Sequence, residues 1–399
     1  MLYETKKMNQ DYDSIRPYTD EETSRALRRV ADAPELKAIS TFIYGPGQDR
    51  EDALRARLRS TDSIYGFQAG VMAGVIRSIL QQTSSSLEVE GLENVEDGRK
   101  HVLMSNHRDI ILDPAIIQLI LFDSGVSTTE IAVGDNLIAS SLIEDIFRSN
   151  RMIKVVRGGT PREKYVASSL LSSYMRGNIA SGRCSVWIAQ RGGRSKDGCD
   201  ATSQGVLKML DMSGSGDFIK DFSEISVLPI AISYQFEPCD FLKARELFIS
   251  RRGQYVKKPG EDTHSILTGV TQQKGGIAFH FCRALSMEEI ASCAVQGKER
   301  FKALAALIDD RICSSYRLWD TNYIALDILE GNDAGSSYYT AENRLSFIER
   351  MEKGLSAILQ KDPDMDKDEL REIFLSIYAN PVRSSRVHPA GGKGNSYPV

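Results

Sequence analysis

The segment SNHRDIILDP, residues 105–114, brings one histidine and two aspartates close together in the chain. A histidine held by a carboxylate can accept the proton of an attacking hydroxyl, which is the work of a general base. His107 is that histidine, and either Asp113 or Asp109 can orient its ring. The triplet His-Arg-Asp also occurs in protein kinases. However, Pro114 stands where a kinase has its metal-binding Asn, no GxGxxG precedes the loop, and no DFG follows it, so we set the kinase function aside.

The elements expected around His107 bring it to the edge of a sheet. The apolar run HVLMS, residues 101–105, is typical of a buried strand, and Asn106 and His107 follow it directly. Open α/β sheets place their chemistry at the carboxyl ends of strands. Asp113 followed by Pro114 indicates a helix start, with the aspartate as N-cap and the proline as the first helical residue. The loop between them can then fold His107 back onto Asp113.

Three further segments carry residues suited to an anionic or apolar ligand. Arg157 follows the strand-like run RMIKVV, and its planar guanidinium can donate two parallel hydrogen bonds to a phosphate. In WIAQRGGRSKDG, Gly192 and Gly193 let the backbone approach a ligand closely, so their N–H groups can bind an oxyanion or a phosphate. Arg194 adds a fixed positive charge beside them. In ISVLPIAISY, Pro229 lies inside a strand-like run, which favours a strand end or an edge position.

Strand-like and helical segments alternate through the middle of the chain, which predicts an α/β fold with a mixed central sheet flanked by helices. The strand-like segments are residues 87–95, 101–105, 151–156, 184–189, 225–234 and 275–281, the last of which would end the sheet. Apolar residues at three- and four-residue spacing predict helical extensions at both ends. We divide the chain into a helical N-terminal region (1–84), an α/β domain (85–284), a helical C-terminal region (285–380) and a flexible tail (381–399).

The four motifs, in this order, resemble those of the glycerolipid acyltransferases, which esterify glycerol-3-phosphate and lysophosphatidate. That family has Asn-His followed by Asp, a strand ending in Arg, Gly-Gly-Arg-Ser, and a strand with an internal Pro. The resemblance runs from about Leu87 to His280. Two positions depart from the family pattern: five residues rather than four separate His107 from Asp113, and Arg191 stands where the family has Glu.

The resemblance implies an O-acyltransferase of phospholipid biosynthesis in which His107 is the general base, oriented by Asp113 or Asp109. It assigns the acceptor phosphate to Arg157, Gly192, Gly193, Arg194 and Ser195. The motifs gain support from Asn106, Arg108, Arg191 and Pro229. It implies that the strand at residues 227–234 lines the acyl-chain pocket. The expected donor is acyl-CoA or acyl carrier protein, used as a co-substrate with no bound cofactor. The alternatives are another lysolipid acceptor and a catalytically silent lipid- or phosphate-binding protein on the same fold.

Composition and charge limit the class of protein, its partners and its expected location in the cell. The 399 residues are 41% hydrophobic and 26% charged, as in ordinary globular proteins, and the net charge of −4 argues against a nucleic-acid partner. Residues 1–22 lack the apolar core of a secretory signal, and no run approaches the roughly 20 apolar residues that span a bilayer. We expect a cytoplasmic protein that contacts the inner face of a membrane peripherally. We expect no metal, because the cysteines form no CxxC pair and DPDMDKDELREI lacks the Gly and the final Glu of a calcium loop.

Overall fold

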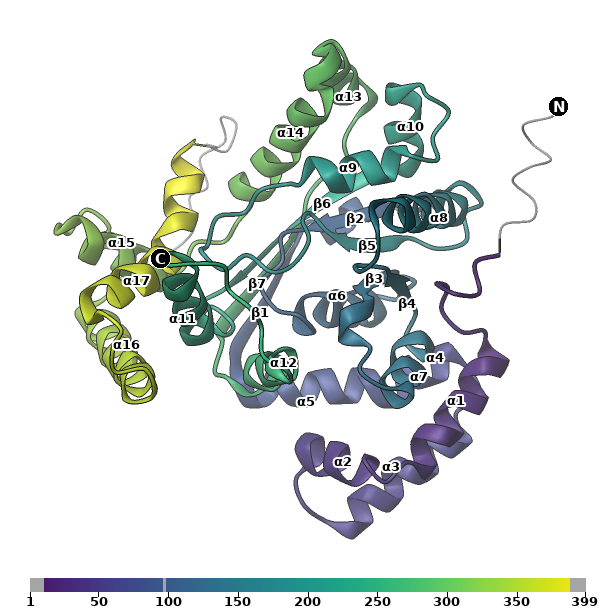
Figure 1. The fold of residues 1–399 in the computed structure, drawn as a ribbon, viewed down its shortest axis with the longest axis horizontal. Coiled ribbons are helices and arrows are strands. Elements are labelled where there is room, and N and C mark those ends of the chain that lie inside the picture. Colours follow the sequence, from purple (N-terminus) through teal and green to yellow (C-terminus); the bar gives the residue numbers. More distant parts are fainter. Residues whose placement is uncertain (1–10, 96–97, 388–399) are drawn as a thin grey trace.

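A seven-stranded sheet forms the centre of the computed structural model, which describes residues 11–95 and 98–387 (Figure 1). The strands are β1 (Ser84–Glu90), β2 (Val102–Ser105), β3 (Glu130–Gly134), β4 (Met152–Val155), β5 (Val186–Ala189), β6 (Val227–Tyr234) and β7 (Gly275–Phe281). Their order across the sheet is β1-β7-β6-β2-β5-β3-β4. Neighbouring strands are parallel except β6 and β7, which are antiparallel. The predicted mixed sheet flanked by helices is confirmed.

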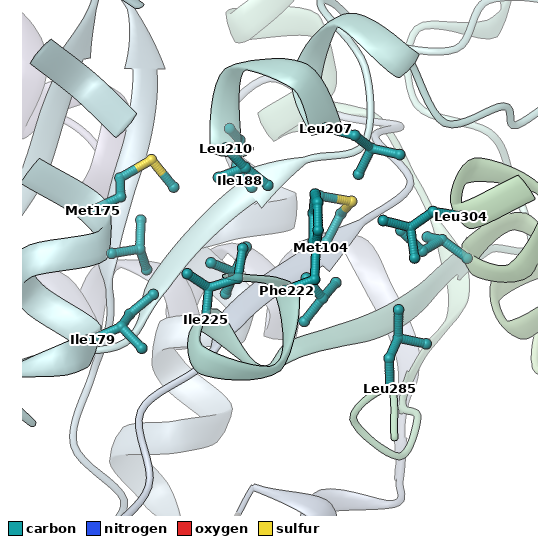
Figure 2. Close-up of a cluster of buried hydrophobic side chains, with 14 of the residues drawn as sticks. Met104, Met175, Ile179, Ile188, Leu207, Leu210, Phe222, Ile225, Leu285 and Leu304 are labelled. Atoms are coloured by element: carbon teal, nitrogen blue, oxygen red, sulfur yellow. The ribbon is translucent and has the colours of Figure 1, made fainter. Parts of the chain in front are cut away.

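Helices cover both faces of the sheet because the central strands are apolar on both sides. Every residue of β2 and of β6 is buried. Val102 and Met104 belong to one hydrophobic core, shown in part in Figure 2, with residues from α8 (Pro161–Ala180), α9 (Gln204–Asp211), α10 (Phe218–Ile225), α13 (Met287–Ala294) and α14 (Arg300–Ser314). Leu103 belongs to the opposite core, with α5 (Ala73–Thr83) and α6 (Leu112–Asp123). Successive residues of β2 therefore pack into different cores.

The N-terminal helices form a core of their own beside the sheet. They are α1 (Asp20–Asp32), α2 (Leu36–Tyr44), α3 (Gln48–Ser60) and α4 (Ile64–Phe67), and a π-helical turn, Gln68–Met72, joins α4 to α5. Leu27, Leu54 and Phe67 lie at the centre of this core. The helix α7 (Ser141–Ser149) contacts α1, and α12 (Glu261–Thr271) contacts α5. These contacts attach the N-terminal helices to the α/β part of the chain.

The C-terminal helices form another core against α11 (Asp240–Ser250). They are α15 (Asp320–Glu330), α16 (Ala341–Lys361) and α17 (Lys367–Val387). Phe347, Phe374 and Tyr378 are buried between them. No helix within residues 11–95 and 98–387 combines the length and the apolar character needed to cross a membrane.

Two expectations about the sheet need correction. The sequence patterns missed β3, which begins with a buried acid: the Glu130 carboxylate accepts hydrogen bonds from Tyr174 and Asn178. The last strand in the chain, β7, does not end the sheet but lies between β1 and β6. The edge position belongs to β1, whose largely exposed residues tolerate solvent on both faces.

The C-terminal boundary also differs from the prediction. Residues 381–387 continue α17 instead of starting a flexible tail, and Pro381 and Val382 are buried there. Val382 is part of the core around α11, so burial of apolar surface holds this turn of the helix in place. The remainder of the predicted tail, residues 388–399, lies outside the described residues.

Pro229 lies inside the central strand β6, not at a strand end or a sheet edge. It pairs with Met104 of β2, and its carbonyl accepts a hydrogen bond from the N–H of Cys282 at 2.9 Å. Because the N and O atoms of one strand residue face the same neighbour, the missing N–H donor of Pro229 also faces Cys282. That residue comes just after the end of β7. The proline therefore removes one hydrogen bond at a point where its partner strand has already ended.

Phe374 is fully buried in the C-terminal core and stacks on Phe241. We therefore expect its side chain to contribute strongly to the stability of the fold. We predict that Phe374→Ala lowers the free energy of unfolding by about 3–5 kcal/mol, because it leaves a cavity. Leu345→Ala on the neighbouring α16, where the side chain is 62% exposed, is the matched control and should change stability by less than about 0.5 kcal/mol. Urea unfolding followed by circular dichroism measures both, and equal losses would contradict the prediction.

Candidate active site

A cavity of about 850 Å³ opens at the carboxyl ends of β2, β5, β3 and β4. His107 follows β2, Arg157 follows β4, and residues 191–194 follow β5, and all of them line this cavity. The four strands are parallel neighbours, so their carboxyl ends meet at one edge of the sheet. The volume is within the range of small-molecule sites, about 300–1,000 Å³. Three of the four sequence motifs therefore meet at one site.

The imidazole of His107 lies in the wall of the cavity and is held by Asp113. Its Nδ1 lies 2.9 Å from Oδ2 of Asp113, and the ring packs edge-on against Trp187. The His107 side chain is 13% exposed, whereas Asp113 is fully buried. With Nδ1–H donated to the carboxylate, Nε2 is the nitrogen with a lone pair for a substrate hydroxyl. The extra residue between His107 and Asp113 thus does not prevent their contact.

The Asp113 carboxylate accepts three hydrogen bonds besides the contact with His107. The backbone N–H groups of Arg108 and Asp109 donate to Oδ2 at 2.6 and 2.9 Å, and the Tyr234 hydroxyl donates to Oδ1 at 2.7 Å. Burial raises the pKa of Tyr234 well above its usual value, and the neighbouring Asp113 raises it further. The phenol therefore remains protonated and acts as a donor. These bonds hold the buried charge in one position.

Asp109, the other candidate to orient His107, holds the start of α6 instead. Its Oδ1 accepts hydrogen bonds from the N–H groups of Ile111 and Leu112 at 2.9 and 2.8 Å. The first N–H groups of a helix need such partners, so α6 begins at Leu112 and not at Pro114 as predicted. Asp113 consequently lies in the first turn rather than at the N-cap. Burial, and then the nearby Asp113, raises the pKa of Asp109.

Asn106 fastens the loop to the neighbouring strand β6. Its Nδ2 donates to the carbonyl of Ile232 at 2.9 Å, and its Oδ1 accepts from the N–H of the same residue at 2.8 Å. Nδ2 also donates to Asp200 at 3.0 Å. The side-chain amide thus replaces a backbone partner at the point where β2 ends, and this explains why the position before His107 needs an amide.

Arg108 anchors the loop from the other side. Its guanidinium is buried, forms an ion pair with Asp200, and lies 3.6 Å from Glu237. Lys243 of α11 pairs with Glu237 and donates to the carbonyl of Arg108 at 2.9 Å. Burial raises the pKa of Asp200, and the charge of Arg108 offsets only part of this rise. Because buried charges are tolerated only when paired, this cluster resists movement of the His107 loop.

The loop after β5 is tied to the protein at several points. The N–H of Gln190 donates to the carbonyl of Ser105, and its carbonyl accepts from the N–H of Ser203, both at 2.8 Å. In the middle of the loop, the N–H of Ser195 donates to the carbonyl of His107 at 2.8 Å. The Gly-Gly-Arg-Ser motif and the His107 loop are therefore in direct contact.

Ser195 itself supports this loop. Its hydroxyl donates to the carbonyl of Cys199 at 3.0 Å, and the residue is 1% exposed. Because its N–H is bonded to His107, both of its donors are directed into the protein. In this structure Ser195 thus has a supporting position in the loop, with neither donor directed into the cavity.

Arginine and glycine residues form a cationic wall of the cavity. Arg157 lies against the backbone of Gly192, where a Cβ atom would come within 2.8 Å of its Nη1. Gly193 has a φ of +80°, a conformation that favours glycine. Nη1 of Arg194 is buried and has no hydrogen-bond partner among the described residues. Arg191 lines the same wall. The structure therefore gathers the predicted phosphate residues, except Ser195, in one place.

Another part of the lining is apolar. It includes Val133, Leu137, Val155, Val156, Leu171 and Met209. These residues belong to β3, β4, α8, α9 and the segments that follow the two strands. Residues 227–234 do not line the cavity, because β6 lies between β7 and β2 and is completely buried. The strand predicted to line an acyl-chain pocket is therefore not part of this cavity, whereas β3, which the sequence patterns missed, is.

Several residues of the site escaped the sequence motifs. Tyr234 was expected to contact an acyl chain, yet its hydroxyl bonds to Asp113, which is 121 positions away in sequence. Asp200, Glu237 and Lys243 support the loop through Arg108. The only local signal was a set of charged residues close to strand ends, and such a signal does not identify partners. No cluster of His, Cys, Asp and Glu suited to a metal ion is found in the described residues.

Comparison with known proteins identifies the domain that carries this site. Residues 86–233 match the model of the family described as Acyltransferase, so the resemblance seen in the motifs is confirmed. Among solved structures, the 1-acyl-sn-glycerophosphate (LPA) acyltransferase PlsC from Thermotoga maritima is 13% identical, with a TM-score of 0.38 over 72% of this chain and 94% of that chain. No curated protein sequence matches the chain significantly.

The geometry predicts different effects for the two aspartates. Asp113→Asn keeps the shape of the side chain but removes the charge that orients His107, so kcat/KM for acyl transfer should fall by about 10²–10⁴-fold. Asp109→Asn, the matched control, keeps an oxygen for the N–H groups of α6 and should lower kcat/KM by less than about tenfold. Steady-state kinetics with thiol release as the readout compares them. A greater loss from Asp109→Asn would transfer the orienting role to that residue.

Proposed function

We propose that this chain, whose residues 86–233 match the acyltransferase family model, transfers a fatty acyl group from a thioester to a hydroxyl of glycerol-3-phosphate or lysophosphatidate. The observation that carries the proposal is the position of His107. Its ring lies in the wall of the cavity and is held by a buried carboxylate. One part of the cavity wall is cationic and another part is apolar. That combination suits a base acting between a phosphorylated acceptor and an acyl chain.

The chemical step needs a base and no covalent intermediate. Nε2 of His107 accepts the proton of the acceptor hydroxyl as its oxygen attacks the thioester carbonyl. The charge of Asp113 stabilises the imidazolium that forms. The carbon–sulfur bond then breaks, and the thiolate leaves with the proton from the imidazolium. The products are an ester and a free thiol, and His107 returns to its neutral form.

The cationic wall binds the acceptor in this proposal. Arg157 and Arg194 are the residues assigned to its phosphate, because a guanidinium donates two parallel hydrogen bonds to a phosphate. Support comes from the buried Nη1 of Arg194, which has no hydrogen-bond partner in the described part of the chain. Gly192 and Gly193 bring backbone N–H groups to the same wall, where they can stabilise the phosphate or the developing oxyanion. Binding the phosphate fixes the hydroxyl near His107 and lowers the entropic part of the barrier.

The apolar part of the cavity receives the acyl chain. Val133, Val155 and Leu171 lie there, on β3, β4 and α8. Burying methylene groups against such a surface contributes about 0.8 kcal/mol per group. The donor is acyl-CoA or acyl carrier protein, acting as a co-substrate, and the mechanism uses no bound cofactor.

The proposal includes a cellular setting. A lysophosphatidate acceptor and its diacylated product partition into a bilayer, so the enzyme meets them at a membrane surface. We place it in the cytoplasm, in peripheral contact with the inner face of the membrane, as a step of phospholipid biosynthesis.

The direct test is product detection by mass spectrometry. Purified protein is given palmitoyl-CoA or palmitoyl carrier protein together with glycerol-3-phosphate, lysophosphatidate or another lysolipid. We predict acylated product with a phosphorylated glycerol acceptor, and a loss of at least about 10²-fold in His107→Ala, because the base is removed. His280→Ala, on the far strand β7, is the matched control and should keep full turnover.

The outcomes separate the alternatives. Product from a different lysolipid only would retain the acyltransferase and change its acceptor. Binding of vesicles or phosphate without product from any pair of substrates would favour a catalytically silent protein. Full turnover in His107→Ala would end the general-base mechanism.

A further inference from the structure

The cationic wall carries one arginine more than the proposed function uses. Arg157 and Arg194 are assigned to the acceptor phosphate, while Arg191 lines the same cavity without a role. Arg157 packs on Gly192, the residue next to Arg191, so the side chains approach from β4 and from β5 to the same short segment. In the resembling family a glutamate occupies this position, and an arginine there changes the local charge by two units.

The other charges of this wall are in ion pairs or hydrogen-bonded, whereas its three guanidinium groups form no ion pair within the described residues. Burial raises the pKa of the Asp109 carboxyl, the charge of Arg194 offsets part of this rise, and the Arg194 side chain also contacts Cys239. Lys257 forms an ion pair with Asp262, and Lys196 forms one with Glu246. Asp197, the remaining acid of the lining, accepts a hydrogen bond within its own loop from the N–H of Cys199. Among the described residues, no ion pair joins a carboxylate to Arg157, Arg191 or Arg194. Such groups repel one another until an anion lies between them.

The electrostatic state of Lys196 agrees with an excess of positive charge. Burial, together with the charges of Lys257 and Arg194, lowers the pKa of Lys196 to about 8. A dianion bound at this wall would relieve that repulsion. The cavity therefore favours a ligand with two negative charges over a ligand with one.

The backbone around Arg191 is fixed before any ligand arrives. Gln190, the preceding residue, is bonded to Ser105 and Ser203, and Ser195 is bonded to His107. The segment between these anchors is short, so the backbone of Arg191 is held beside the wall. A preorganised cation loses less entropy on binding than a mobile one.

We infer that Arg191 is a specificity-determining residue, completing a cradle of three arginines that selects acceptors with a terminal phosphate dianion. The inference rests on the proposed function and names its substrate class. A phosphomonoester has three terminal oxygens, enough for three guanidinium groups. A phosphodiester lysolipid has one charge and two such oxygens, and a cationic head group would meet Arg191 with like charge. Glycerol-3-phosphate and lysophosphatidate therefore bind, and lysophosphatidylethanolamine is rejected.

Direct binding tests the cradle without relying on turnover. Isothermal titration compares glycerol-3-phosphate with glycerophosphoethanolamine on the parent chain and on Arg191→Gln. We expect Arg191→Gln to weaken glycerol-3-phosphate binding by about 10–100-fold, the usual loss for one charge-assisted contact, and glycerophosphoethanolamine binding by less than about threefold. Arg191→Glu should weaken the monoester further and favour the ethanolamine diester. Arg25→Gln, an exposed position on α1, should change neither.

The losses of affinity for the two ligands in Arg191→Gln decide whether the cradle exists. Equal losses for both ligands in Arg191→Gln, or no loss for either, would overturn the cradle. Turnover measured on the same proteins separates this failure from failure of the proposed function. Selective binding that depends on Arg191 but yields no acylated product would support the three-arginine cradle and contradict the proposed acyltransferase activity. Product formation together with unchanged acceptor selectivity in Arg191→Gln would support the acyltransferase activity and contradict the cradle.

Discussion

The buried carboxylate of Asp113 is the interaction on which the site depends. An unpaired charge in the interior would be strongly unfavourable, and here it meets His107, the Tyr234 hydroxyl and two backbone N–H groups. Its partners come from the His107 loop and from β6, while Asp113 itself belongs to the first turn of α6. One carboxylate therefore sets the position of the imidazole, the path of the loop and the contact of both with the sheet.

A second layer of buried charge holds this arrangement in place. Arg108 connects the loop to Asp200 and Glu237, and Lys243 connects the same loop to α11. The N–H of Glu237 in turn donates to the hydroxyl of Tyr378 on α17. The C-terminal helices are thus joined to the His107 loop through hydrogen bonds and not only through apolar packing. These contacts restrict movement of the loop that holds the imidazole in the cavity wall.

Much of this site was predictable from local sequence patterns. A buried strand ending before Asn106 predicts an imidazole at a sheet edge, and parallel strands bring Arg157 and the glycine loop to that edge. Partners distant in sequence were not predictable, because no local pattern links Tyr234 to Asp113. The β3 strand was missed because its apolar run is short and follows a buried glutamate. The acyl-chain lining was assigned to β6 because of the family resemblance. The start of α6 was misplaced because Asp109, not Asp113, bonds the first N–H groups.

The protonation state of His107 tests the central claim most directly. Nitrogen-15 NMR distinguishes the two ring nitrogens, and comparison with His107→Gln assigns the signals among the five histidines. The account predicts a proton on Nδ1, donated to Asp113, and a lone pair on Nε2 when the ring is neutral. Loss of this preference in Asp113→Asn would agree with it. A neutral ring protonated on Nε2 in the parent protein would contradict it, because that nitrogen could not accept a proton from an acceptor hydroxyl.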